Sequence, residues 1–206
     1  MKLVIIGAGG HGQVVADAAL AAGFEVLGFL DDDRSLFGRK FLGMSVLGPI
    51  AAAHDMDAGC VVAIGDNRCR KQIVDLLGLP AQRYAAVIHP RATVSPYAEV
   101  LPGAMVLAGA IVGPQAVVGS HSIINHGSSI DHHDIVGAFA HVAPGCHAGG
   151  NVHIGNGAFL GVGVSVVPGT TIGNWATVGA GSVVLHDVPE ATVVAGVPAR
   201  ELRKGE

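Results

Sequence analysis

The chain has 206 residues, of which 50% are apolar and 14% are charged, and its net charge is −4 at pH 7. This length and apolar content allow a substantial buried core in one large domain or two small ones. The negative net charge argues against nucleic acid as a partner. No apolar stretch approaches the roughly 20 residues of a membrane span, and the three cysteines form no CxxC pair. We therefore expect a cytoplasmic protein without a membrane or nucleic-acid partner.

In the first 85 residues, apolar runs alternate with helical segments. The predicted strands cover residues 3–7, 25–33 and 60–67, and the predicted helices cover 11–23 and 68–77. Gly23 closes the first helix, and the predicted strands are short and apolar, which is typical of buried parallel strands. This order indicates a small Rossmann-like parallel α/β sheet covered by helices, to which we assign residues 1–85.

A glycine-rich loop connects the first predicted strand to the first helix. Residues 7–12 (GAGGHG) satisfy GxGxxG, a pattern that lets backbone amides approach a pyrophosphate at a helix N-terminus. Asp31 and Asp32 follow at the end of the next strand, where an acid can bind a ribose. No second mononucleotide unit follows, so a nucleoside diphosphate explains the motif better than a dinucleotide. Alternatively, the glycines only form a tight turn and the acids only end a strand at a solvated edge.

From Ile88 onward, every sixth residue is apolar. These positions are Ile88, Val94, Val100, Val106, Val112, Val118, Ile124, Ile130, Val136, Val142, Ala148, Ile154, Leu160, Val166, Ile172, Val178 and Val184. An α-helix needs apolar residues about 3.6 apart, and a hairpin sheet shows alternation between longer turns, so neither explains a strict period of six. A parallel β-helix explains it, with three units in each triangular coil and the aliphatic side chains inside. We assign this β-helix residues 86–188.

The ends and the outer faces of such a solenoid need covering. The N-terminal domain can cover one end, and residues 189–206 can cap the other, because Pro189 and Pro198 stop the repeat. The outward positions carry Val, Ala and Gly and hardly any charge, and there is no lysine between Lys71 and Lys204. Such faces should not meet water, so we expect a homotrimer that buries them.

With these motifs in view, the chain resembles the left-handed β-helix (hexapeptide-repeat) acyltransferases. The segments IIGAGGHGQVVAD, FLDDD, AIGDNRCRKQI and GVPAR extend the resemblance to bacterial nucleotide-sugar N-acetyltransferases that modify 4-amino sugars and to sialic acid O-acetyltransferases. The resemblance implies transfer of acetyl from acetyl-CoA to the amino group of a nucleotide-linked amino-deoxysugar (4-amino-4,6-dideoxysugar type), without a metal. It also implies active sites at the subunit boundaries of the trimer.

The repeat places His132 two residues past the inward Ile130, so its side chain should point outward from a corner. Gly150 follows eighteen residues later and should stack on it. This pairing suits a base that takes a proton from an attacking amine, beside a backbone amide that stabilises the oxyanion on a thioester carbonyl. The resemblance implies the same roles, with His132 as the general base and Gly150 as the amide donor. The alternative is a surface histidine without a catalytic role.

The residue after the base departs from the pattern of the family. Relatives carry an acid there that orients the imidazole, whereas this chain has His133, with Asp131 before the histidine pair and Asp134 after it. A second imidazole cannot supply the same negative charge. Asp131 or Asp134 could substitute, but neighbouring residues of a strand point to opposite sides, so the carboxylate partner stays open. The base could then be weaker than in relatives, or the acceptor could be a hydroxyl.

The resemblance also implies coenzyme contacts at His141, Val162 and Ala180. Val162 and Ala180 are eighteen residues apart, so they should stack along one edge and offer backbone groups. Simple surface packing is the alternative for each of the three residues. Arg200 or Arg203 could meet the phosphates of the coenzyme, although a solvated basic tail explains them more simply.

A nucleotide-sugar site in the N-terminal domain is implied as well. The residues that match the motifs of the family there are Gly9, Gly10, His11, Asp31, Asp32 and Gly65. His11 is not needed for a turn, which favours a ligand role for the loop over a structural one. The nearest alternative acceptor is a hydroxyl of a sialic acid or of another sugar.

The remaining histidines raise the question of a metal site. His126, His147 and His153 match no role in the family, and we assign them to the trimer faces. No two histidines from His121 to His153 lie eighteen residues apart, so none stack, and a zinc site within one chain is disfavoured. The alternatives from other classes are a zinc enzyme of the γ-carbonic anhydrase type, whose histidines converge across subunits, and a nucleotide sensor without turnover.

Overall fold

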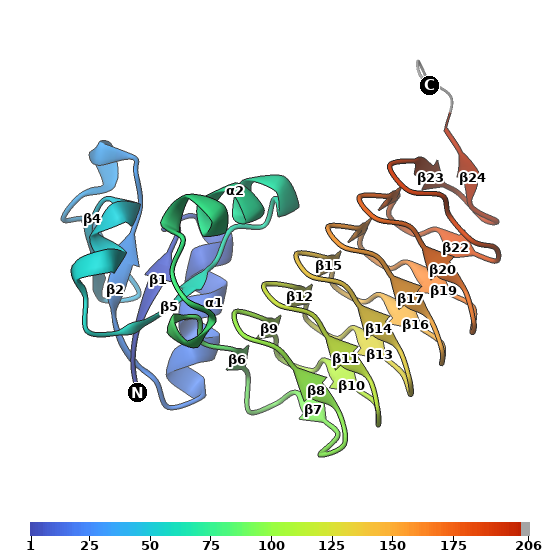
Figure 1. The fold of residues 1–206 in the computed structure, drawn as a ribbon, viewed down its shortest axis with the longest axis horizontal. Coiled ribbons are helices and arrows are strands. Elements are labelled where there is room, and N and C mark those ends of the chain that lie inside the picture. The colour runs from blue at the N-terminus through green and yellow to red at the C-terminus, as the bar shows by residue number, and fades with distance from the viewer. Residues whose placement is uncertain (203–206) are drawn as a thin grey trace.

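A computed structural model describes residues 1–202, which form an N-terminal α/β domain followed by a long solenoid (Figure 1). Residues 203–206, and with them the predicted phosphate contact at Arg203, lie outside the described residues. Within residues 1–202, no helix combines the length and the apolarity that crossing a membrane requires.

The N-terminal domain contains a five-stranded sheet in the order β3-β4-β2-β1-β5. Its strands are β1 (Lys2–Ile6), β2 (Glu25–Leu30), β3 (Lys40–Phe41), β4 (Met44–Gly48) and β5 (Gly59–Val62), its α-helices are α1 (Gly10–Ala21) and α2 (Asn67–Leu77), and its 3-10 helices are η1 (Arg34–Leu36), η2 (Ile50–Asp55) and η3 (Ala81–Arg83). All strand pairs are parallel except β3 with β4. The predicted parallel α/β sheet is confirmed, whereas the sequence does not predict the β3–β4 hairpin, and the strands predicted over 25–33 and 60–67 end at Leu30 and Val62.

The solenoid consists of two-residue strands joined by short turns. They are β6 (Val87–Ile88), β7 (Thr93–Val94), β8 (Glu99–Val100), β9 (Met105–Val106), β10 (Ile111–Val112), β11 (Val117–Val118), β12 (Ile123–Ile124), β13 (Ser129–Ile130), β14 (Ile135–Val136), β15 (His141–Val142), β16 (His147–Ala148), β17 (His153–Ile154), β18 (Phe159–Leu160), β19 (Ser165–Val166), β20 (Thr171–Ile172), β21 (Thr177–Val178) and β22 (Val183–Val184). They stack into three sheets, which we call the first (β7 to β22), the second (β8 to β20) and the third (β6 to β21).

The predicted period of six is confirmed at every coil. Each aliphatic position named from the sequence is the second residue of its strand, and residues eighteen apart pair in register, as Val112 and Ile130 do. These side chains form one continuous apolar core inside the solenoid. Only the first coil leaves them partly exposed, for example at Ile88 and Val94.

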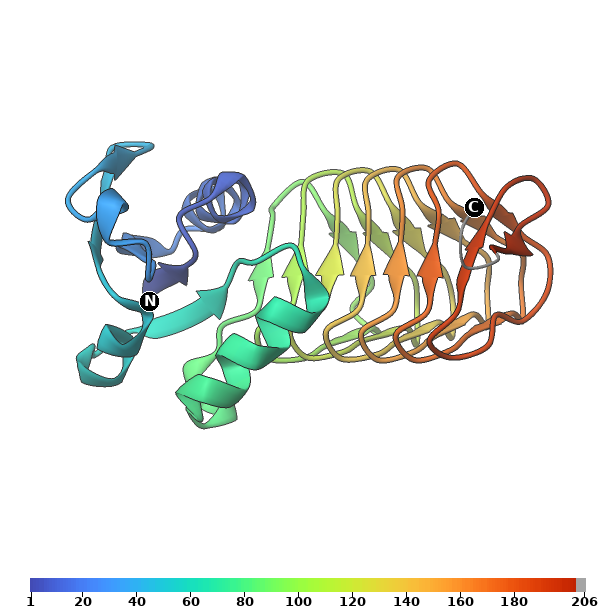
Figure 2. The same cartoon turned by 90° about the horizontal axis from the view of Figure 1, so that it is seen from above.

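The N-terminal domain lies at the N-terminal end of the solenoid and packs on the outer side of the third sheet (Figure 2). Met105 of β9 and Ile123 of β12 are fully buried in one apolar cluster with Val15 of α1. Figure 2 shows α2 lying beside the early coils. The apolar face of the domain therefore meets the outward residues of the third sheet, and the inward Ile88 and Val94 of the first coil stay partly exposed.

One buried guanidinium joins the two domains. Arg70 of α2 is fully buried, and its Nε donates to the carbonyl oxygen of His121 at 2.7 Å and one terminal nitrogen donates to that of Phe139 at 2.7 Å, both in the solenoid. The other terminal nitrogen donates to the carbonyls of Ile64 and Gly65 at 2.7 and 3.2 Å. Burial lowers the pKa of Arg70 to about 10. Because these acceptors belong to both domains, Arg70 fixes α2 against the solenoid.

The C-terminal segment closes the last coil. The strand β23 (Val193–Ala195) pairs in parallel with β21, and β24 (Arg200–Glu201) turns back antiparallel on β23. Val188 and Val194 complete the apolar interior. Arg200 is exposed and donates to the carbonyl of Ala199.

Candidate functional site

The loop between β1 and α1 contains two glycines that no other residue could replace without strain or collision, and two glycines with free space around them. Gly7 has a φ of 102°, and a Cβ on Gly12 would overlap the carbonyl oxygen of Gly7. A Cβ on Gly9 or Gly10 would meet no atom within 4 Å. Gly7 and Gly12 therefore make the tight turn, while Gly9 and Gly10 leave free space at the N-terminus of α1, where backbone amides can bind an anion.

The two predicted ribose-binding acids partly serve the fold. Asp31 accepts the amide hydrogen of Ala8 at 2.8 Å, which ties it to the glycine loop, and that of Asp33 at 2.9 Å. Asp32 accepts the amide hydrogen of Ile50 at 2.9 Å. Each carboxylate holds the strand end in shape and can still accept further hydrogen bonds from a ligand.

Residues expected in the nucleotide site and in the coenzyme site meet at the domain boundary. The imidazole rings of His11 and His141 are 6.1 Å apart, and the carbonyl oxygen of Gly65 lies 3.2 Å from Nδ1 of His141. Nε2 of His11 is buried without a hydrogen-bond partner within the described chain. Burial, together with the nearby His141 and Arg70, lowers the pKa of His11 to about 4. This ring is therefore neutral at pH 7 and available to a ligand.

The protonation of His141 is fixed by its two neighbours. Nδ1 faces a carbonyl oxygen, that of Gly65, so it must donate. Nε2 lies 3.1 Å from Nδ2 of Asn125, and the orientation of that amide is set because its Oδ1 accepts the amide hydrogen of His126 at 2.9 Å. Nε2 therefore accepts. Burial, with Arg70 as a second cause, lowers the pKa of His141 to about 4, which agrees with a neutral ring.

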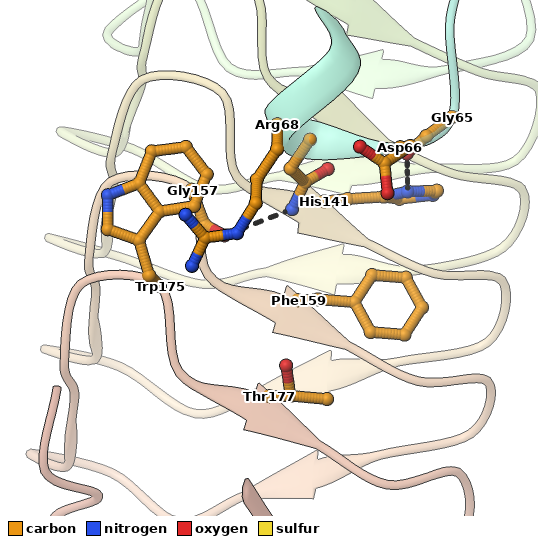
Figure 3. A pocket seen from close by; sticks show the side chains of 9 residues that line it. Gly65, Asp66, Arg68, His141, Gly157, Phe159, Trp175 and Thr177 are labelled. Atoms are coloured by element: carbon orange, nitrogen blue, oxygen red, sulfur yellow. Dashed lines mark hydrogen bonds between the residues drawn. The ribbon is translucent and has the colours of Figure 1, made fainter. Parts of the chain in front are cut away.

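A cavity of about 510 Å³ opens beside His141 between α2 and the third sheet (Figure 3). His141, Phe159 and Thr177 line its floor on successive strands of that sheet. On one wall, the guanidinium of Arg68 lies 4.6 Å from the ring of Trp175. The cavity therefore runs along the solenoid axis from the domain boundary toward the C-terminal coils, so it suits a long ligand.

The structure stacks His132 on Gly150 as the repeat predicts. His132 lies in the turn between β13 and β14, and a Cβ on Gly150 would collide with its imidazole ring. The backbone N–H of Gly150 donates no hydrogen bond within residues 1–202. An imidazole and an unpaired amide hydrogen thus lie together at an outer corner.

Both aspartates that flank the histidine pair bind backbone amides. Oδ1 of Asp131 accepts the amide hydrogen of His132 at 2.6 Å. The buried Asp134 accepts those of Asp131 and Val152, both at 2.8 Å. Burial raises the pKa of Asp134 to about 6. Neither carboxylate hydrogen-bonds the His132 ring, whereas Nδ1 of His133 lies 3.0 Å from Nδ1 of His132.

Val162 and Ala180 lie in one exposed column at the corner that follows the third sheet. The column is visible in the backbone, since Gly163 donates to the carbonyl of Pro144 and Gly181 to that of Val162. Within the described residues, the N–H groups of Val162 and Ala180 have no partner. His126 occupies the same column, two coils before Val162, so it lies on this edge of the solenoid.

The described residues hold no group of three or more His, Cys, Asp or Glu side chains that could bind a metal ion.

Comparison with known proteins agrees with this geometry. Residues 2–77 match the PglD N-terminal domain family, and residues 151–186 match the bacterial transferase hexapeptide family. The acetyltransferase domain of PglB from Neisseria gonorrhoeae FA1090, solved with acetyl coenzyme A, is 38% identical over 98% of both chains, with a TM-score of 0.90. This chain belongs to the left-handed β-helix family of bacterial sugar N-acetyltransferases.

Two other members of this family support the assignment. PerB from Caulobacter crescentus, solved with CoA and GDP-perosamine, is 36% identical over 98% of both chains, with a TM-score of 0.90. The UDP-N-acetylbacillosamine N-acetyltransferase of Bacillus subtilis (strain 168) is 35% identical over 101 residues, which span 45% of this chain and 45% of that protein. The left-handed β-helix fold predicted from the sequence is thereby confirmed.

Several residues of this sugar N-acetyltransferase site are missed by sequence reasoning. Asn125, which orients His141, is a small polar residue at a corner and looks like any other turn residue. Arg68 and Trp175 are 107 positions apart and meet only because α2 packs against the solenoid. Only the segment around Asn67 and Arg70 indicated such a contact in the sequence. Its polar residues at the start of a helix are costly to bury unless they have hydrogen-bond partners.

Proposed function

We propose that this chain moves the acetyl group of acetyl-CoA to the amino group of a nucleotide-linked amino-deoxysugar of the 4-amino-4,6-dideoxysugar type. The observation that carries the proposal is the His132 ring lying on Gly150, whose N–H is unpaired within residues 1–202. A base and an oxyanion donor are the two groups that amine attack on a thioester needs. The acetyl coenzyme A and GDP-perosamine in the solved relatives support the choice of donor and acceptor.

In the proposed reaction, the sugar amine attacks the thioester carbonyl directly. His132 removes the proton from the attacking nitrogen through Nε2, and the Gly150 amide hydrogen-bonds the carbonyl oxygen as it becomes an oxyanion. Collapse of the tetrahedral intermediate breaks the carbon–sulfur bond and releases the CoA thiolate. No acyl-enzyme is needed, and Cys146 is unsuited to form one because its thiol is buried and its pKa is raised by burial.

We assign the cavity at His141 to the acyl arm of acetyl-CoA. Its length along the solenoid suits the pantetheine chain. Val162 and Ala180 do not line this cavity, but their N–H groups, which are unpaired within residues 1–202, lie at the corner after the third sheet and can bind carbonyls of the coenzyme where it leaves the cavity. The nucleotide-sugar then lies across Gly9, Gly10 and Asp32, with His11 and Gly65 at the sugar end of the site.

A homotrimer completes the proposed site. His132 lies at the corner between the first and second sheets, whereas His141 lies on the third sheet, so one chain holds the two residues on different sides of its triangular section. A neighbouring copy can bring its His132 to this cavity. The exposed Ile111 and Ile135, on the first and second sheets, are apolar surface that such a neighbour would cover. We place the enzyme in the cytoplasm because all three cysteines are free thiols.

The test is CoA release with UDP-, GDP- and dTDP-linked 4-amino sugars, compared with free sialic acid. We expect turnover with at least one nucleotide-linked amine and an amide signal in the proton NMR spectrum of the product. The variant His132→Ala should lose transfer and keep nucleotide binding, measured by thermal shift. Activity on free sialic acid alone would replace the proposal with O-acetylation, and nucleotide binding without any CoA release would indicate a sensor.

A further inference from the structure

The imidazole of His133 is the only polar partner of the His132 ring among the described residues. The two Nδ1 atoms are 3.0 Å apart, and the rings are nearly perpendicular, with centroids 5.2 Å apart and an interplanar angle of 86°. Both side chains are exposed in the single chain. A hydrogen bond between two neutral imidazoles contains one hydrogen, so one ring donates and the other accepts.

The direction of this hydrogen bond decides whether His132 can act as a base. If Nδ1 of His132 donates, its Nε2 carries a lone pair beside Gly150, where the proposed reaction needs it. If Nδ1 of His132 accepts, a neutral His132 carries its hydrogen on Nε2 and cannot take a proton there. A hydrogen bond at one ring nitrogen thus sets the chemistry of the other.

The carboxylates near the pair do not set the direction. Asp131 accepts the amide hydrogen of His132 and Asp134 accepts two other amide hydrogens, so neither binds an imidazole nitrogen. Both carboxylates nevertheless lie in the same turn as the pair. In relatives, a single acid can both orient the imidazole and supply a negative charge. In this chain, His133 contacts the His132 ring, and the negative charges belong to Asp131 and Asp134.

We propose that His133 is a positioning residue that accepts the Nδ1 hydrogen of His132 and thereby keeps the Nε2 lone pair of His132 ready for the sugar amine. Nδ1 of His133 is the acceptor, and its own hydrogen lies on Nε2, which faces solvent. The inference rests on the proposed function, which requires this direction of the hydrogen bond, but the position of the hydrogen on each ring can be measured without any substrate.

The residues that stack on His133 in neighbouring coils show which substitutions its backbone conformation accepts. Residues eighteen apart in this column all have positive φ, with values of 61° at Gln115, 61° at His133, 60° at Asn151 and 74° at Gly169. Asparagine and glycine therefore already occupy this conformation in neighbouring coils. His133→Gly removes the imidazole without adding strain, and His133→Asn restores an acceptor, the side-chain carbonyl oxygen.

The experiment compares wild-type protein with His133→Gly, His133→Asn and the matched control Gln115→Gly, which makes the same backbone change in the previous coil. Nitrogen-15 NMR at a pH where His132 is neutral reports which of its nitrogens carries the hydrogen. We expect hydrogen on Nδ1 in wild type, in His133→Asn and in the control, and a mixture in His133→Gly. In His133→Gly, kcat should fall roughly tenfold while both KM values stay within about twofold.

Two results would overturn the inference. One is an unchanged Nδ1 hydrogen in His133→Gly, and the other is a His133→Asn variant whose NMR pattern and kcat match those of His133→Gly. If the wild-type protein transfers no acetyl group to any substrate, the proposed function fails, and the NMR comparison still decides the role of His133 because it needs no substrate.

Discussion

In a β-helix, residues eighteen apart stack in a column, and a glycine in such a column leaves an open space where the other coils have a side chain. Pro114, His132, Gly150 and Pro168 follow one another at intervals of eighteen residues, and only Gly150 both lacks a side chain and keeps a free N–H. The His132 ring leans into the space that a Cβ would fill. The same glycine therefore seats the base and presents the oxyanion donor beside it.

Replacing Gly150 with alanine tests this arrangement. The new Cβ would collide with the His132 ring and push it away from the amide, so we expect kcat to fall about a hundredfold. The KM for acetyl-CoA should change little, because the cavity at His141 is on another sheet. Steady-state kinetics with a melting curve would check this, and full activity in a well-folded variant would contradict the seating of the ring.

Two buried histidines and one partly buried histidine set the expected pH dependence of stability. Burial is the main cause that lowers the pKa of His11, His121 and His141 to about 4 each. In the unfolded chain they protonate below pH 6.5, so between about pH 6.5 and 4 the unfolded state binds more protons, and the free energy of unfolding falls as the pH falls. Asp134, with a pKa raised to about 6, acts in the opposite direction below pH 6. Three groups outweigh one, so we expect Tm to fall from pH 7 to pH 5.

The variant His121→Phe should flatten this dependence. Nδ1 of His121 is buried without a partner in the described chain, and its ring stacks on Phe139. Phe139 has nearly the same positive φ one coil later, so the column accepts a phenylalanine. A Tm that falls as steeply as in wild type would show that His121 does not contribute.

At the scale of elements, the sequence predicts the strands of the solenoid but not how the two domains pack together. The six-residue period predicts every strand of the solenoid because one aliphatic residue per turn suffices to build its core. The β3–β4 hairpin lacks such a signal, since β3 has two residues and neither is buried. The position of the N-terminal domain depends on outward residues such as Met105 and Ile123, which resemble inward ones in a sequence.

The contact between α2 and the solenoid gives an element-scale prediction. Removing the Arg70 guanidinium in Arg70→Met leaves several buried carbonyls without a donor, so we expect a loss of about 3 kcal/mol or more of stability and a higher KM for the nucleotide-sugar. The control Lys71→Met, at the next position of the same helix, removes an exposed pair with Asp75 and a cation–π contact of Nζ with the Phe139 ring at 5.9 Å, and should cost only about 1 kcal/mol. Denaturant unfolding measures the free energy of unfolding of both variants, and equal losses in the two would contradict the role of Arg70.

The candidate site was predictable in its parts and not in its assembly. The glycine loop, His132, Gly150 and His141 follow from motif, period and family resemblance. The convergence of His11 with His141 does not, because it depends on how two independently folded units pack. The role of His133 needed the distance between two ring nitrogens, which no sequence pattern encodes.

At the scale of the whole molecule, His132 of one copy is proposed to serve the cavity at His141 of its neighbour. Co-expression of His132→Ala and His141→Ala chains with different affinity tags, followed by purification on both tags, yields mixed trimers. Each parent alone should be inactive. In each mixed trimer one of the three boundaries combines an intact His132 from one chain with an intact His141 from the other, so we predict CoA release at up to about one third of the wild-type rate. Mixed trimers as inactive as both parents would contradict a site shared between subunits.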